Sequence, residues 1–116
     1  MSHFRQIEQP DEDLETDFKF SSRDLVVGSK ARKLGIRLTA LIDDKKAAEI
    51  ESVHLPFGHI DRLSSAGLNE LIAANTYARN LGIRIVLVDV QNTVRDVFEL
   101  TRLERMFDFE STTAGV

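Results

Sequence analysis

Apolar and polar residues follow clear periods in the second half of the chain. Apolar side chains recur at nearly helical spacing from residue 65 onward, which predicts a helix over 65–80 that stops at Gly82. Residues 83–90 are almost continuously apolar and β-branched, as in a strand buried on both faces of a parallel sheet. Asn92 or Thr93 should cap another helix, and residues 107–109 should form a last short strand. Strand and helix therefore alternate, which indicates an α/β fold.

The first half has weaker patterns. Alternate apolar residues share one face over 36–42, which predicts a strand, and residues 43–51 are rich in helix formers and should form a short helix. Residues 53–57 are a further strand candidate, although Pro56 cannot donate to a ladder. Residues 18–20 suggest an earlier strand, and residues 25–27 are either its hairpin partner or part of a helix. Residues 21–37 (SSRDL…ARKLGIR) resemble residues 64–84 (SSAGL…ARNLGIR), which favours a helix over 23–34.

Composition and charge limit the protein class. A length of 116 residues fits one domain, and 42% hydrophobic with 29% charged residues are globular values. The first twenty residues hold two basic and six acidic side chains, which equals the whole net charge of −4. We expect a flexible acidic lead-in over 1–17, or alternatively a segment that contacts a basic partner, before a single domain over 18–116. The negative charge disfavours direct binding of nucleic acid.

The sequence also indicates where the protein works. No apolar run reaches the length of a membrane helix, so we expect no membrane insertion. The first residues show no apolar stretch typical of a secretory signal. The chain has no cysteine, which is compatible with a reducing compartment. A cytoplasmic protein is the expectation.

Signatures of catalysis and metal binding are missing from the sequence. There is neither a GxxxxGK[ST] loop nor a GxGxxG fingerprint. His54, His59 and Asp61 lie close in sequence, but their spacing is not that of a metal site. Ser65, His59 and Asp61 could be drawn as a triad, yet three neighbours in one loop rarely adopt that geometry. We expect no catalytic residue, no metal and no cofactor.

The most informative segment is HIDRLSSAGLNELIAAN, residues 59–75. Ser64 and Ser65 should occupy the N-cap and the first turn of the helix over 65–80, where backbone N–H groups are unpaired and the helix dipole is positive. A phosphate on Ser65 would fit there without unfolding the domain. The simpler alternative is that either serine only caps the helix. The polar residues Asp61, Arg62, Ser64 and Asn69 flank Ser65, either as a binding surface or as ordinary solvated positions.

Two segments carry a resemblance to a known family. Residues 55–72, LPFGHIDRLSSAGLNELI, resemble the central signature of STAS domains in the anti-sigma-factor antagonist family, in which Asp-Ser-[Ser/Ala]-Gly-Leu opens a helix. Residues 83–116 look like the family's next strand, its Val…Val-Phe-x-Leu-Thr-x-Leu helix and a short aromatic strand. Residues 36–44 look like the family's strand and acidic turn. The resemblance implies an α/β, STAS-like fold with a mixed, mostly parallel sheet of about four to five strands and helices packed against it.

The resemblance also implies roles for individual residues. Ser65 falls on the phosphorylated serine of the family, and Ser64 replaces the usual Asp, so phosphorylation of Ser64 is an alternative. Gly67 and Leu68 match the family directly, and Asp43 falls on an acidic residue near the phosphorylation site. The interval from Asp43 to Ser64 looks short, so the first helix should be cut to about two turns. The implied partner-binding residues are Asp43, Asp61, Arg62, Ser64, Ser65, Gly67 and Asn69.

Members of this family act by partner switching. The resemblance implies a protein that binds an anti-sigma factor of the GHKL kinase type when unphosphorylated. It would be released when that serine kinase phosphorylates it, and a phosphatase would reset it. The chain itself would then be a kinase substrate and not an enzyme. The alternative is a STAS module without a serine switch, acting as a scaffold or as an accessory subunit of a lipid or anion transport system.

Overall fold

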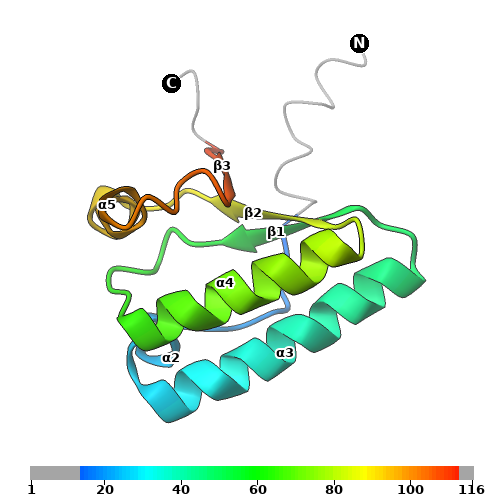
Figure 1. Ribbon diagram of the computed structural model, residues 1–116, viewed down its shortest axis with the longest axis horizontal. Coiled ribbons are helices and arrows are strands. Elements are labelled where there is room, and N and C mark those ends of the chain that lie inside the picture. The colour runs from blue at the N-terminus through cyan, green and yellow to red at the C-terminus, as the bar shows by residue number, and fades with distance from the viewer. Residues whose placement is uncertain (1–13, 113–116) are drawn as a thin grey trace.

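The computed structural model describes residues 14–112, and residues 1–13 and 113–116 lie outside the described part. Figure 1 shows an α/β domain in which helices lie against a small sheet. In chain order the elements are α2 (Ser22–Val26), α3 (Gly28–Ala47), β1 (Ser52–Pro56), α4 (Ser65–Asn80), β2 (Arg84–Val88), α5 (Asn92–Leu100) and β3 (Asp108–Glu110).

The sheet is open and parallel. Its strand order is β1-β2-β3, with Val53 opposite Ile85 and Leu87 opposite Phe109. Parallel neighbours need a crossover connection, and α4 and α5 supply the two crossovers. Within residues 14–112 the sheet has three strands, all parallel, so a mixed sheet of four to five strands is not found there. Leu14 adds an isolated parallel bridge to His54.

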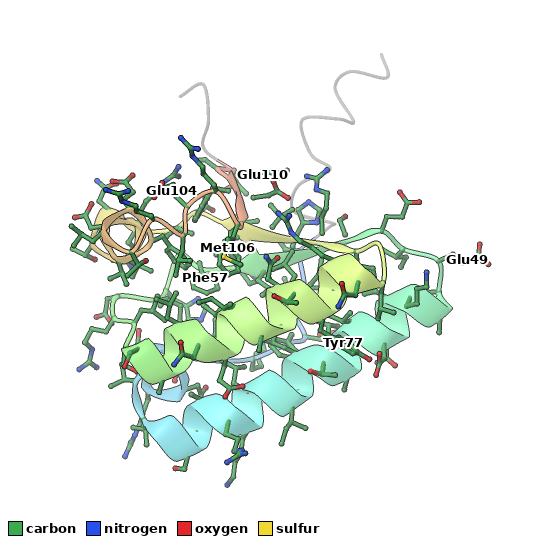
Figure 2. All side chains as sticks on the ribbon, viewed as in Figure 1. Glu49, Phe57, Tyr77, Glu104, Met106 and Glu110 are labelled. Carbon is green, nitrogen blue, oxygen red and sulfur yellow. The ribbon has the colours of Figure 1, made fainter. Side chains whose placement is uncertain are left out.

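The core lies between the sheet and the pair formed by α3 and α4 (Figure 1). Alternate residues of β1 and the adjoining loop point into it, and Figure 2 shows Phe57 between the sheet and α4. The ring of Phe57 lies 5.4 Å from that of Phe20. On α5, Phe98 meets Phe107 and Phe109 edge-on, with ring centroids 5.2 and 5.5 Å apart. The buried aliphatic side chains that face one another here are Leu34, Leu38, Ile42, Val53, Leu55, Leu71, Ala74, Ala78, Ile85 and Leu87.

The second half of the chain follows its sequence pattern. The helix predicted over 65–80 is α4, and its predicted stop, Gly82, has a positive φ of 77°. The apolar run 83–90 contains β2, which is buried at four of its five positions. The helix predicted after residue 91 is α5, although its N-cap is Gln91 instead of Asn92 or Thr93. The last strand lies at 108–110, one residue beyond the prediction.

The predicted strand over 36–42 is wrong, because these residues belong to α3. The buried side chains of α3 are Ala31, Leu34, Leu38 and Ile42, whose spacing of three and four residues is helical. Ile36 and Ala40, which the alternation placed on the same face as Leu38, are exposed. The helix predicted over 43–51 is only the last turn of α3. The expected helix of about two turns between Asp43 and Ser64 is therefore not found, and Asp43 lies inside a helix of 20 residues.

The segment before α3 is also helical. Residues 18–20 form no strand, and residues 25 and 26 end the short helix α2, so the hairpin alternative is wrong and the helical one is confirmed. The two SS motifs of the sequence repeat both begin helices. The glycines near the ends of the two similar segments have different positions. Gly82 ends α4, whereas Gly35 lies inside α3, where the Glu70 side chain occupies the space of a Cβ.

Most of the expected lead-in over 1–17 lies outside the described residues. Its last residues contact the domain: the backbone N–H of Glu15 donates to the carbonyl of His54 at 3.0 Å. The Glu15 carboxylate also forms an ion pair with Lys45 of α3 at 2.7 Å. Residues 14 and 15 are thus attached to β1 and α3, while the boundary at residue 18 stays a prediction.

Candidate functional site

The candidate site lies at the edge of the sheet where β1 and β2 end. Pro56 is opposite Val88, so the segments that lead into α4 and α5 start next to each other. The backbone N–H of Phe57 donates to the Val88 carbonyl at 2.8 Å, and the Gln91 side chain donates to the Gly58 carbonyl at 2.8 Å. The loop over 57–64 is therefore held against the entry to α5.

Ser64 caps α4 and ties it to α2. Its backbone is extended and its hydroxyl oxygen accepts a hydrogen bond from the Gly67 N–H at 3.3 Å, which confirms the predicted N-cap. The hydroxyl lies 3.0 Å from the carbonyls of both Leu25 and Val26, to which it donates. The Ser64 N–H also donates to Leu25 at 3.1 Å. Ser64 therefore forms hydrogen bonds both with the last carbonyls of α2 and with the first turn of α4.

Gly67 allows this close approach of the two helices. A Cβ at Gly67 would overlap the carbonyl oxygen of Leu25, so only glycine lets α2 end against the first turn of α4. Gly67 is buried for this reason. Gly67 therefore serves to pack α4 against α2. Because Gly67 is buried, a partner cannot reach it, contrary to the expectation that it binds one.

Ser65 begins α4 and is exposed. Within residues 14–112 no group forms a hydrogen bond with its hydroxyl. Asp61, Arg62 and Asn69 are also exposed, and together with Ser65 they form what we call the Ser65 surface. The start of α4 lies beside α2 at one end of the domain (Figure 1). Of the seven residues expected to bind a partner, these four share one accessible surface.

Asp61 is held in place from α2. The Ser22 hydroxyl donates to the Asp61 carboxylate at 2.7 Å and accepts from the Asp61 N–H at 2.9 Å. The hydrogen bond from Ser22, helped by the Arg62 guanidinium at 3.6 Å, lowers the pKa of Asp61 below its ordinary value. The Ser65 surface therefore includes a fixed carboxylate that stays ionised at neutral pH.

Asp43 is not part of this site, contrary to expectation. It lies in α3 and accepts a hydrogen bond of 2.5 Å from the hydroxyl of Tyr77, whose pKa that bond raises. Tyr77 is twelve residues beyond Ser65 on α4, which corresponds to about 18 Å along the helix axis. The sequence predicted Asp43 at the end of a strand over 36–42. This prediction is wrong because these residues belong to the helix α3.

A groove of about 400 Å³ adjoins the Ser65 surface. Residues of the loop before α4 line it together with Val26 of α2 and Thr93, Val94 and Val97 of α5. Sequence reasoning did not place these last four residues at the site. The parallel pairing of β1 and β2 was the signal that could have found Thr93 and Val97, because it brings the start of α5 beside the start of α4.

The residues considered for catalysis or metal binding have other partners. Nε2 of His59 lies 2.7 Å from the Phe20 carbonyl, and Asp61 is bonded to Ser22, so His59 and Asp61 do not form a triad with Ser65. His54 lies 3.8 Å from Glu110. In the part of the chain that the structure describes, no three His, Asp or Glu side chains gather in a way that could hold a metal ion.

Comparisons with known proteins place these observations in one family. The STAS domain family matches the chain over residues 6–115. No curated protein matches the sequence. Across residues 14–112, no helix has both the length and the apolar character that a membrane crossing requires.

Proposed function

Because this chain belongs to the STAS domain family, we propose that it is an anti-sigma-factor antagonist that works by partner switching. The unphosphorylated protein binds an anti-sigma factor of the GHKL kinase type through the Ser65 surface. The kinase phosphorylates Ser65, the complex dissociates, and a phosphatase restores the binding form. In this proposal the protein is a cytoplasmic kinase substrate and performs no catalysis itself.

The different environments of the two serines are the observation that carries this proposal. The Ser64 hydroxyl is partly buried and bonded to α2 and α4, so its modification would open the junction between these helices. The Ser65 hydroxyl is exposed at the first residue of α4. A phosphate on Ser65 meets the positive end of the helix dipole and leaves the cap of α4 intact. This contrast favours Ser65 over Ser64 as the modified residue.

The charge of a phosphate accounts for the release of a partner. Phosphorylation adds about −1.5 to −2 charges at pH 7, at a surface where Asp61 is already ionised. A partner seated on that surface loses contact through repulsion and through the desolvation of the phosphate. A loss of at least about 1.4 kcal/mol of binding free energy, which raises Kd tenfold, is enough to release the partner.

The adjoining groove supports a binding role for the unphosphorylated form. Its lining includes the apolar residues Leu63, Val94 and Val97 and the charged residues Asp61 and Arg62. A volume of about 400 Å³ is large enough for one or two side chains of a partner. The unmodified Ser65 surface therefore offers an apolar anchor next to polar groups that define orientation.

Capture from the native host lysate with three baits tests the proposal. The baits are the full chain as wild type, Ser65→Ala and Ser65→Asp, and mass spectrometry identifies the retained proteins. We expect a GHKL-type kinase on the first two baits and its loss from the third. Retention of the same proteins by all three baits would contradict a serine switch. It would favour the constitutive scaffold or transport-accessory role instead.

Phosphosite mapping after incubation with that kinase separates the two serines. We expect phosphate on Ser65 alone, and none on the Ser65→Ala variant. Phosphate on Ser64 in the wild type would refute the assignment of the site, although partner switching itself would survive.

A further inference from the structure

The outer face of α3 carries basic side chains that are not part of the Ser65 surface. Residues 18–37 contain six basic side chains and one acidic side chain. Lys30, Arg32, Lys33 and Arg37 are all exposed on α3, and none of them forms an ion pair with an acidic residue inside 14–112. Arg37 donates to the backbone carbonyl of Lys19 and lies 4.7 Å from the ring centroid of Phe18.

An apolar side chain stands among these cations. Ile36 is 66% exposed, and Arg32 and Lys33 are its neighbours on the helix surface at positions i−4 and i−3. We call this set of five residues, Lys30, Arg32, Lys33, Ile36 and Arg37, the α3 face. An exposed aliphatic side chain beside two positive charges has the composition of an interface centre with a charged rim.

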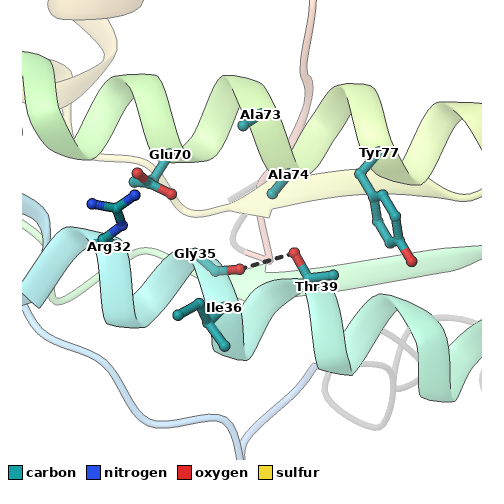
Figure 3. Close-up of a pocket in the computed structure, with 8 residues that line it drawn as sticks. All are labelled: Arg32, Gly35, Ile36, Thr39, Glu70, Ala73, Ala74 and Tyr77. Carbon is teal, nitrogen blue, oxygen red and sulfur yellow. Dashed lines mark hydrogen bonds between the residues drawn. The ribbon is translucent and has the colours of Figure 1, made fainter.

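A groove between α3 and α4 continues the α3 face. Figure 3 shows Arg32 of α3 facing Glu70 of α4 and Ile36 on the side of Gly35 away from α4, and the groove has a volume of about 380 Å³. Gly35, Ala73 and Ala74 also line it, and the exposed Ala73 is the small residue that a visiting helix can approach, because the Glu70 carboxylate covers Gly35 and Ala74 is buried. Glu70 is the acidic residue among the side chains that line the groove, and its carboxylate lies over Gly35.

We propose that the α3 face and this groove bind an acidic amphipathic helix of another protein. The unpaired cations favour carboxylates on the partner, and the exposed Ile36 favours an aliphatic side chain among them. The elongated space between two parallel helices suits a third helix laid along it. The exposed Asp43 and Asp44 at the far end of α3 would repel carboxylates, so the acidic residues of the partner helix must lie over residues 30–37.

This contact uses residues other than the Ser65 hydroxyl. Glu70 and Tyr77 lie one turn or more beyond Ser65 on α4, whereas Asn69 of the Ser65 surface directly precedes Glu70. A helix in the groove would therefore border the Ser65 surface at Asn69.

Fluorescence anisotropy with a labelled peptide tests the proposal. The probe is a helical peptide of about 15 residues that carries glutamates around a central leucine. We expect binding to the full chain to weaken about fivefold or more in the double variant Arg32→Gln/Lys33→Gln. The matched control, Arg102→Gln/Arg105→Gln, removes the same charge from exposed residues elsewhere and should change binding less than about twofold. Ile36→Ser should weaken binding about threefold without changing its dependence on salt.

Several results would overturn the proposal. Equal binding by wild type and the double variant would show that the α3 face is not used. Equal weakening in the matched control would show that only net charge matters. Binding of duplex DNA or phosphatidylglycerol vesicles through Arg32 and Lys33, without binding of the peptide, would replace the proposed helix by that ligand. Urea unfolding of each variant verifies that lost binding is not lost folding.

Discussion

Replacing Gly67 by alanine should destabilise the domain, because the new methyl group has no room. A Cβ at this position overlaps the carbonyl group of Leu25, which belongs to the backbone of α2 and cannot rotate away. Either α2 or the first turn of α4 must move. The movement would break the hydrogen bonds that Ser64 donates to the end of α2.

The size of the effect follows from three contributions. Forcing an extra methyl group into a packed interface costs about 1–3 kcal/mol. Each weakened hydrogen bond from Ser64 costs about 0.5–1.5 kcal/mol. Alanine at a helical position returns up to about 1 kcal/mol through its higher helix propensity. We expect a net loss of about 2 kcal/mol in the free energy of unfolding, or a fall of roughly 10 °C in Tm for a domain of this size.

Urea unfolding followed by circular dichroism measures this loss, and Gly28→Ala is the matched control. Gly28 is the first residue of α3, and a Cβ there meets no atom within 4 Å. The control should be as stable as wild type or slightly more stable. If Gly67→Ala were also as stable as wild type, α2 would not end against α4 as described, and the reasoning would be refuted.

Two further predictions concern the serines and Asp61. Ser64→Ala should lose about 1–2 kcal/mol of unfolding free energy in urea, because it removes the cap of α4, whereas Ser65→Ala should stay within about 0.5 kcal/mol of wild type; equal effects would contradict the assigned cap. Ser22→Ala should raise the pKa of Asp61 toward the ordinary value of an aspartate in an NMR titration, because the strongest cause of its lowering is lost. A lowered pKa stabilises the fold while the carboxylate is ionised, so the stabilisation from the Ser22 contact is present above about pH 4 and disappears as the pH falls through the folded-state pKa. An unchanged pKa would show that the contact is absent in solution.

The second half of the fold could be predicted because its signals are local. The run over 83–90 is too apolar and too β-branched for anything but a buried strand, and Gly82 marks the end of the helix before it. The prediction of the first half failed where the same apolar residues fit both an alternating and a helical pattern. Leu38 and Ile42 fit both an alternating strand and a helix, and only Ala31 and Leu34 extend the helical spacing toward the N-terminus.

Some residues of the candidate site could likewise be predicted from local sequence, and others could not. Ser64 and Ser65 could be placed from sequence, because capping depends on residues next to each other in the chain. Asp43 was misplaced together with the strand that was expected to carry it. The roles of Ser22 and Gly67 depend on α2 meeting α4, a contact between residues about forty positions apart that no local pattern reports.

The affinity of the phosphorylated protein for its kinase partner is the most direct test of the central claim. The full chain with phosphoserine incorporated at position 65 is compared with the unmodified chain by isothermal titration calorimetry against the purified GHKL-type partner. We predict that phosphoserine at 65 weakens binding at least tenfold, about 1.4 kcal/mol, while the far-ultraviolet circular dichroism stays unchanged. Equal affinity of the two forms would contradict a switch at Ser65.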